Sequence, residues 1–203
     1  NINVKTMDKI KTTHVGSLPR SKRLSEILFK KDKNELFDQG ELDKIIEEDV
    51  NKIVKKQIDI GIDIISDGEM SKISYATYVK DRLHGFSGES ERRAPKDLDD
   101  FPSYKEKIAK SGGTPTYTRP CCTADLKIKD TKSLTKDISN LKSALKKNNH
   151  SQGFINSASP GVISNFLPNK FYKNDDKYLE ALSKIMKTEY DEITKNDLLL
   201  QID

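Results

Sequence analysis

The feature that most constrains the fold is the alternation of short apolar runs with longer segments of helical periodicity. Apolar residues recur at helical spacing over about 42–60, 133–147 and 175–195, and a shorter stripe of this kind follows residue 21. Between these segments lie four short runs with strand composition, at 11–16, 62–65, 153–157 and 198–203. Strands that alternate with helices predict an α/β fold, with a parallel sheet joined by right-handed crossovers.

The middle of the chain departs from this regular alternation. We expect a helix at about 74–83, ending near Gly85, and then a polar stretch at 87–115 that buries little core. The segment 116–128 has strand composition interrupted by Pro120, which favours a hairpin or capping strand over a central strand. The sequence therefore predicts a single domain over 1–203, with a long excursion at about 86–130 of the kind that is usually functional or mobile.

Composition narrows the classes of partner. The chain has 203 residues and a net charge of +4, and its lysines are interleaved with Asp and Glu rather than gathered with aromatics, which favours a solvated surface over a nucleic-acid-binding face. No apolar run reaches the roughly 18 residues that span a bilayer, and the first residues lack a signal-peptide pattern. The two cysteines, Cys121 and Cys122, are adjacent and lack the spacing of a zinc site. We expect a cytoplasmic protein that binds neither nucleic acid nor membrane.

The loop after the first predicted strand is a candidate binding site. In the stretch KTTHVGSLPR at 11–20, Gly16 allows a turn and Ser17 offers a hydroxyl at its mouth. In α/β folds, ligands bind at the carboxyl ends of the strands, where this loop lies. The hydroxyl of Ser17 could equally satisfy its own loop, and His14 could be either a core polar group or a functional one.

The second predicted strand ends in Asp67, Gly68 and Glu69. Carboxylates two positions apart in a strand point to the same side, and the glycine between them would let a ligand approach. Such carboxylates can bind a substrate ammonium by charge-assisted hydrogen bonds. The alternative is an ordinary Asp-Gly turn whose glutamate begins the next element.

Four sequence blocks carry a family resemblance. TTHVGSLPR at 12–20, GIDIISDGE at 61–69, ASPGV at 158–162 and LLLQID at 198–203 resemble, in this order, the cobalamin-independent methionine synthase family. They are most similar to its shorter members, which keep only the catalytic barrel. The resemblance implies a (β/α)8 barrel of the TIM type, which needs about 250 residues, so the chain would hold only its first four or so β/α units, a truncated barrel.

The resemblance also implies roles for individual residues. The family's Gly-Ser pair binds the amino-acid end of the thiol substrate, which corresponds to Gly16 and Ser17. Its glutamate and aspartate contact the substrate amino group, and they correspond to Glu69 and Asp203. The larger synthases have an apolar residue at the position of His14, and the family usually has His at that of Asp67, so the chain departs from the pattern at both. Arg119 resembles the region near the folate site, although a surface arginine fits equally well.

The reaction implied by the resemblance is methyl transfer from a 5-methyltetrahydrofolate-type donor to homocysteine, which gives methionine. In the family, zinc binds the thiol and lowers its pKa, so that a thiolate attacks the methyl group. The family's zinc ligands belong to blocks beyond the one that ends at Asp203. We therefore expect this chain alone to hold no metal site and no catalytic residue, and to be inactive by itself.

Two other functions remain open. The first is alkylation of another thiol, as in the similar epoxyalkane–coenzyme M transferases, whose acceptor is a sulfonate without an amino group. The second is a non-catalytic half-barrel that binds a ligand or partner. Such a half-barrel would have to hide the open edge of its sheet, for example as a homodimer.

Overall fold

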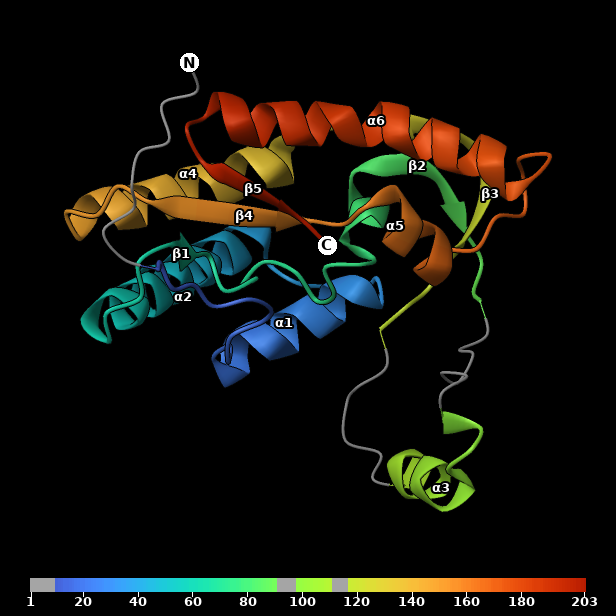
Figure 1. Cartoon of the computed structure of the whole chain (residues 1–203), viewed down its shortest axis with the longest axis horizontal. Helices are drawn as coiled ribbons and strands as arrows, with labels where there is room; N and C mark the ends of the chain where they lie inside the picture. Colours follow the sequence, from blue (N-terminus) through green and yellow to red (C-terminus); the bar gives the residue numbers. More distant parts are fainter. Residues whose placement is uncertain (1–9, 91–97, 111–116) are drawn as a thin grey trace.

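The computed structural model describes residues 10–90, 98–110 and 117–203, and its elements alternate along most of the chain (Figure 1). The helices are α1 (Lys22–Asp32), α2 (Gln39–Asp59), α3 (Pro102–Lys110), α4 (Lys132–Lys147), α5 (Pro160–Phe166) and α6 (Asp175–Lys195), with a 3-10 turn, η1, at Tyr78–Asp81. The strands are β1 (Ile65–Ser66), β2 (Leu83–Ser87), β3 (Cys121–Ile128), β4 (Gly153–Ser157) and β5 (Leu199–Ile202). Parts of the predicted excursion, 91–97 and 111–116, lie outside the described residues.

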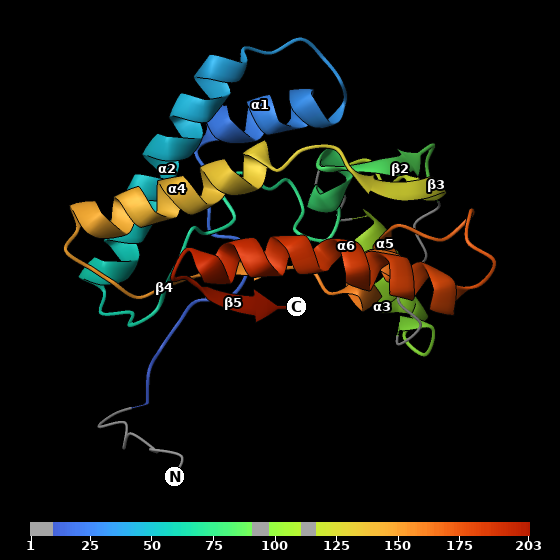
Figure 2. The same ribbon diagram turned by 90° about the horizontal axis from the view of Figure 1, so that it is seen from above.

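A parallel sheet with the order β1-β4-β5 is the centre of the fold. Ile65 pairs with Gly153, and Phe154 pairs with Leu199. Figures 1 and 2 show the long helices following one another along this sheet, and contacts join α2 to β1, α4 to β4, and α6 to β4 and β5. The α/β class with parallel strands, predicted from the alternation of elements, is therefore confirmed.

The long helices begin and end where local chemistry favours it. The side chain of Asp38 accepts a hydrogen bond from the backbone N–H of Glu41 at the start of α2, and Asn174 does the same for Lys177 in α6. Gly61 follows α2 with a φ of +84°, as glycine does after many helices. The helices predicted at 42–60, 133–147 and 175–195 and the strand at 153–157 are confirmed, and α2 begins three residues earlier because of its Asp38 cap.

The first predicted strand is much shorter than expected. Within 11–16, only Thr13 forms a β-bridge, parallel to Ile64, while the Thr12 carbonyl accepts hydrogen bonds from the N–H groups of Asp63 and Ile64. The second strand is shifted toward its C-terminal side, to Ile65–Ser66. Gly16, with a φ of +91°, turns the chain away directly after the bridge. The prediction was correct in location and wrong in length.

The helix predicted at 74–83 is absent from the described structure. Residues 78–81 form the short turn η1, and 83–87 form β2, which pairs antiparallel with β3. Gly85 has a φ of +107° at an irregularity in the register, and a Cβ there would lie 2.9 Å from the Ala124 carbonyl oxygen. Within 74–83 only the short turn η1 is helical, and the pairing of β2 with β3 begins where the predicted helix was expected to end.

The hairpin of β2 and β3 confirms the interpretation of 116–128 as a strand outside the central sheet. It packs with α5 and α6 around a second apolar cluster that includes Cys122, Ile163 and Tyr178. The excursion contains one helix that was not predicted, α3, which Figure 1 draws apart from the sheets. The predicted ASPGV loop continues at Pro160 into α5.

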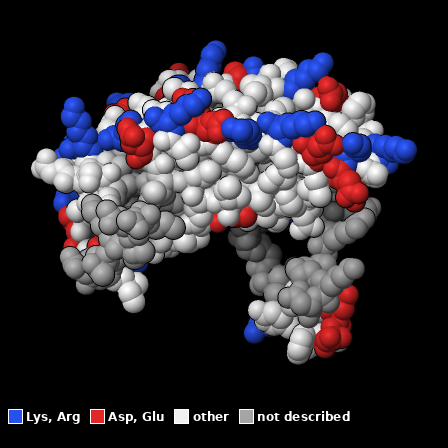
Figure 3. Space-filling view, turned by 45° about the horizontal axis from the view of Figure 1, so that its top comes forward, with Lys and Arg blue, Asp and Glu red and all other residues white. Residues whose placement is uncertain are grey.

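Charges of both signs alternate over the face of the molecule shown in Figure 3. On α6, Glu180 accepts hydrogen bonds from both Lys177 and Lys184, and Lys187 pairs with Asp191. This mixture is what the interleaved sequence predicts for a solvated surface. Within the described residues, the structure contains no helix with the length and apolar character to span a bilayer.

Candidate functional site

Three residues that are distant in sequence meet through one asparagine. Ser17 Oγ donates a hydrogen bond to Glu69 Oε2 at 2.6 Å. Asn156, near the end of β4, donates through Nδ2 to Glu69 Oε1 at 2.8 Å and to Asp203 Oδ2 at 3.2 Å. Ser17, Glu69 and Asp203 were each predicted to bind substrate, and the structure places them in one cluster at the carboxyl ends of the parallel strands.

The turn at 67–69 sets the direction of the Glu69 side chain. Glu69 has a φ of +56°, unusual for a residue with a side chain, and its N–H donates to Asp67 Oδ1 at 2.8 Å. Asp67 therefore holds the backbone of the turn instead of pointing beside Glu69 as a second carboxylate of a pleated strand. Both side chains are buried.

Gly68 does not leave room for a ligand, contrary to the prediction. Its φ is +65°, and a Cβ at this position would lie 2.9 Å from Met70 Cε, 3.1 Å from Leu18 Cβ and 3.3 Å from Ile53 Cγ2. The space above the glycine is filled by apolar side chains of the core. Gly68 is thus needed for the turn and for close packing.

Arg20 fixes the backbone of the same turn from the neighbouring loop. Its guanidinium donates to the Glu69 carbonyl at 2.7 Å, to the Met70 carbonyl at 3.3 Å and to the Lys72 carbonyl. Burial lowers the pKa of Arg20, while the nearby carboxylates of Glu69 and Asp67 raise it. The sequence showed a cation directly after Pro19, but nothing in it indicated that the cation would reach residues 69–72.

Lys72 and Asn156 are buried polar residues that the sequence analysis missed. Lys72 Nζ donates to the backbone carbonyl of Asn156 at 3.1 Å and to its side-chain Oδ1 at 3.2 Å. All residues of β4 are buried, including Asn156. The available signal was a lone amide within the run GFINS, because a buried amide needs several hydrogen-bond partners.

The cluster is open to solvent on one side. Gly16 and Ser17 are exposed and Asp203 is partly exposed, whereas Glu69 lies underneath. Tyr75 borders the same region, since burial raises its pKa and the charges of Asp203 and Glu69 raise it further. The Ser17 hydroxyl and the Asp203 carboxylate therefore lie nearer the solvent, and the Glu69 carboxylate lies beneath them.

Two residues of the prediction do not join this hydrogen-bonded cluster. His14 has a solvent-shielded Nε2 for which the described residues provide no hydrogen-bond partner. Arg119 lies over the rings of Tyr117 and Phe166, at 5.3 and 4.7 Å, and donates to the Tyr117 hydroxyl at 3.1 Å. The functional roles proposed for His14 and Arg119 remain predictions.

The donor set of the described residues does not fit a zinc ion. No three His, Cys, Asp or Glu side chains of that part of the chain are grouped so that they could hold a metal. Cys121 and Cys122 are buried in β3, and burial raises the pKa of Cys122 to about 11, which disfavours the thiolate that zinc requires. His84 pairs with Lys127 across the hairpin.

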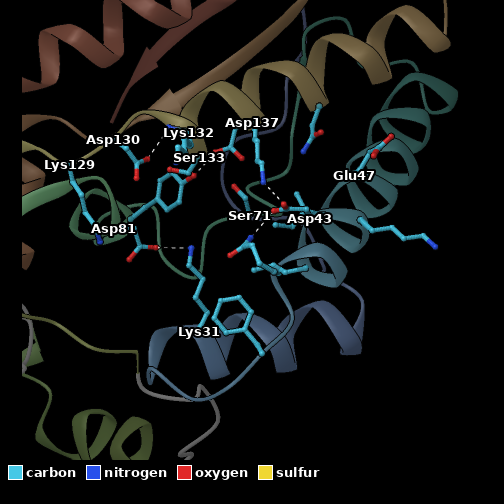
Figure 4. Close-up of a pocket in the computed structure, with 18 of the residues that line it drawn as sticks. Lys31, Asp43, Glu47, Ser71, Asp81, Lys129, Asp130, Lys132, Ser133 and Asp137 are labelled. Atoms are coloured by element: carbon cyan, nitrogen blue, oxygen red, sulfur yellow. Dashed lines mark hydrogen bonds and ion pairs between the residues drawn. The ribbon is translucent and has the colours of Figure 1, made fainter.

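A separate cleft of about 960 Å³ opens between α2, the start of α4 and the connection from α1 to α2 (Figure 4). Ser71, Tyr78 and Asp137 are among its lining residues, whereas Ser17, Glu69 and Asp203 are not. The Tyr78 hydroxyl donates to Asp137 Oδ2 at 2.7 Å. Burial raises the pKa of Asp137 to about 6, against the opposing effect of the Lys72 charge.

Comparison with known proteins identifies the family. The family model described as "Cobalamin-independent synthase, Catalytic domain" matches residues 10–137. The chain therefore belongs to the cobalamin-independent methionine synthase family, as its sequence blocks predicted. It is similar to proteins named 5-methyltetrahydropteroyltriglutamate–homocysteine methyltransferase from Thermosynechococcus vestitus, with 27% identity over 82 residues, and from Bifidobacterium animalis, with 32% over 75 residues. These matches cover 40% and 37% of this chain, and 11% and 10% of the relatives.

Solved structures share the fold over nearly the whole chain. A B12-independent methionine synthase from a Shewanella species, in complex with selenomethionine, superposes with a TM-score of 0.67 at 20% identity, over 95% of this chain and 50% of that one. A vitamin-B12-independent methionine synthase, described as putative, from Listeria monocytogenes gives 0.64 at 18% identity, over 97% and 53%. The chain thus spans about half the length of these solved relatives.

Proposed function

We propose that this chain is the amino-acid-binding half of a methionine-synthase-like methyltransferase. In this proposal, the sheet β1-β4-β5 and the bridged segment at Thr13 are the first four or so β/α units of a (β/α)8 barrel. The complete protein would transfer a methyl group from a 5-methyltetrahydrofolate-type donor to homocysteine. Family membership and the half-length match to solved relatives support this interpretation.

The observation that carries the proposal is the convergence of Glu69 and Asp203 on one asparagine amide. Two carboxylates held at one place and open on one side form a site for a cation, and an ammonium can donate to both of them. Ser17, exposed beside Glu69, can bind the carboxylate end of the same ligand. The three side chains thus suit the two charged ends of an α-amino acid such as homocysteine or methionine.

In this proposal the chain provides no zinc ligand and only one border of the site for the methyl donor. The described donor set does not fit zinc, and the proposal places the zinc ligands in sequence beyond Asp203. Arg119, with its neighbours Tyr117 and Phe166, is the proposed border of the folate site. The chain alone is then expected to bind the amino acid but to transfer no methyl group.

Calorimetric titration of the 203-residue chain tests this proposal. L-Methionine and L-homocysteine should bind, and coenzyme M, which lacks an amino group, should bind much more weakly. Glu69→Gln should abolish the preference, because it removes one of the two charges that attract the ammonium. Preferential binding of coenzyme M would instead favour the epoxyalkane–coenzyme M transferase alternative.

A second function, a non-catalytic half-barrel that binds a partner, is favoured by one observation. Among the described residues, β5 has a strand partner only on its β4 side, and Leu199 and Ile202 are 55% and 53% exposed. An edge of this kind is normally covered by another strand or by a second copy of the chain. Stable association without amino-acid binding would favour this function over the first.

A further inference from the structure

The Asn156 side chain makes three hydrogen bonds within the cluster. Its Nδ2 donates hydrogen bonds to both carboxylates, to Glu69 at 2.8 Å and to Asp203 at 3.2 Å, and its Oδ1 accepts one from Lys72 at 3.2 Å. The amide is buried and lies one residue before the end of β4. One side chain thus links a residue of the β1 loop with a residue that follows β5.

The partners allow only one orientation of this amide. A carboxylate can only accept a hydrogen bond, and a lysine ammonium can only donate one. Rotation of the amide by half a turn would place its oxygen against Glu69 and Asp203 and its NH2 group against Lys72 Nζ. Every one of these contacts would then be repulsive, so Lys72 fixes the amide and the amide fixes the carboxylates.

We propose that Asn156 is a positioning residue that sets Glu69 and Asp203 to receive the primary ammonium of an α-amino acid. This inference rests on the proposed function and adds to it a determinant that no family block contains. One oxygen of each carboxylate accepts a hydrogen bond from Asn156, and the second oxygen of Asp203 accepts one from Gln201 at 2.6 Å. The N–H groups between the carboxylates also reduce their mutual repulsion while the site is empty.

Lys72 has an equally specific position in this arrangement. It is buried, with its Nζ 5.7 Å from the centre of the Tyr78 ring, and it holds both oxygens of Asn156. The positive charge of Lys72 offsets the negative charges of Glu69 and Asp203, while its hydrogen bonds in this cluster go to Asn156. An ammonium ligand can therefore approach the carboxylates without displacing Lys72.

The test is a pair of ligands that differ only in the ammonium. L-Methionine and 4-(methylthio)butanoate are titrated into the wild-type chain, Asn156→Leu and the control Asn51→Leu, whose amide lies in α2 and donates to Glu47. Asn156→Leu should weaken the binding of L-methionine by about tenfold or more, because hydrogen bonds to charged groups are lost. The affinity for 4-(methylthio)butanoate should change by less than about twofold. Equal losses for both ligands would show a merely structural role and overturn the inference.

A second measurement does not depend on ligand binding. In a 15N-labelled chain, the Asn156 side-chain amide resonances should shift in both Glu69→Gln and Asp203→Asn. If they respond to neither substitution, the bridge does not exist and the inference fails, whatever the chain binds. If they respond to both while the wild-type chain binds no L-methionine, the proposed function fails and the ammonium role of Asn156 fails with it.

Discussion

At the scale of single residues, the turn after β1 holds a charged side chain in an unfavourable backbone conformation. The left-handed φ of Glu69 is sustained by the Asp67 carboxylate on its N–H and by Arg20 on its carbonyl. Backbone conformations of this kind persist where surrounding contacts compensate for their cost. The contacts therefore indicate that the direction of Glu69 is built into the fold.

Gly68 should be much more sensitive to substitution than a glycine of similar backbone. Gly68→Ala is expected to lower the free energy of unfolding by about 2–4 kcal/mol, because the left-handed φ adds to a clash with Met70 and Leu18. Gly61→Ala is the control, since Gly61 has a φ of +84° with no atom within 4 Å of the added Cβ. Urea denaturation measures the unfolding free energy of both variants. Equal destabilisation by Gly68→Ala and Gly61→Ala would contradict the packing argument.

Asp137 should give the stability of the protein a distinct dependence on pH. Burial raises its pKa from 3.8 to about 6 in the folded chain, with Lys72 opposing and Asp67 reinforcing this effect. Because the folded pKa is above the unfolded one, the stabilisation is complete below about pH 4 and is lost as pH rises through about 6. The free energy of unfolding should therefore fall by roughly 2–3 kcal/mol across this pH range.

The variant Asp137→Asn isolates this effect, because an amide of the same shape does not titrate. The difference in unfolding free energy between wild type and Asp137→Asn should fall between pH 4 and pH 7. If the difference in unfolding free energy between wild type and Asp137→Asn does not change with pH, the Asp137 carboxylate is not held in the protonated form.

How far the site could be predicted depended on the kind of contact. Ser17, Glu69 and Asp203 follow strand ends in recognisable blocks, so the sequence could indicate them. Asn156 and Lys72 are 84 positions apart and meet only because β1 and β4 are neighbours. Contacts made by a sheet crossover leave no local pattern, which explains why these two residues were missed.

At the scale of secondary-structure elements, periodicity predicted the helices that pack on the sheet and missed the strand β2. The helices α2, α4 and α6 each bury one apolar stripe, which their sequences show directly. In β2, by contrast, the conformation is imposed by its partner β3 and by the bulge at Gly85. Such a strand cannot be told from a short helix by its own residues.

The contact between α2 and α4 should contribute a large share of the stability. Leu141 of α4 is fully buried in the cluster that α2 and α4 share, so Leu141→Ala should lower the free energy of unfolding by about 3 kcal/mol. Leu36→Ala removes the same atoms at a position that is 98% exposed, and it should change stability by less than about 0.5 kcal/mol. Denaturant titration of the two variants measures the difference, and similar values would contradict this account of the core.

At the scale of the whole molecule, the sheet and its helices account for about half the length of the solved relatives. Within the described residues, β5 is paired on one side only and leaves Leu199 and Ile202 on its surface. Burial of these side chains would be favourable, at about 25 cal/mol for each Å² removed from water. The edge of β5 is therefore the surface at which further sequence or a second copy would add to the fold.

The 203-residue chain, studied alone, should associate through this edge. Sedimentation equilibrium is expected to give a mass that rises with concentration above the 23.0 kDa of the chain. Leu199→Lys should suppress the rise, because a charge at a strand edge opposes strand pairing. Leu36→Lys places the same charge at a loop residue that is 98% exposed, and it should leave the association unchanged. A mass of 23.0 kDa at all concentrations would contradict edge-to-edge dimers.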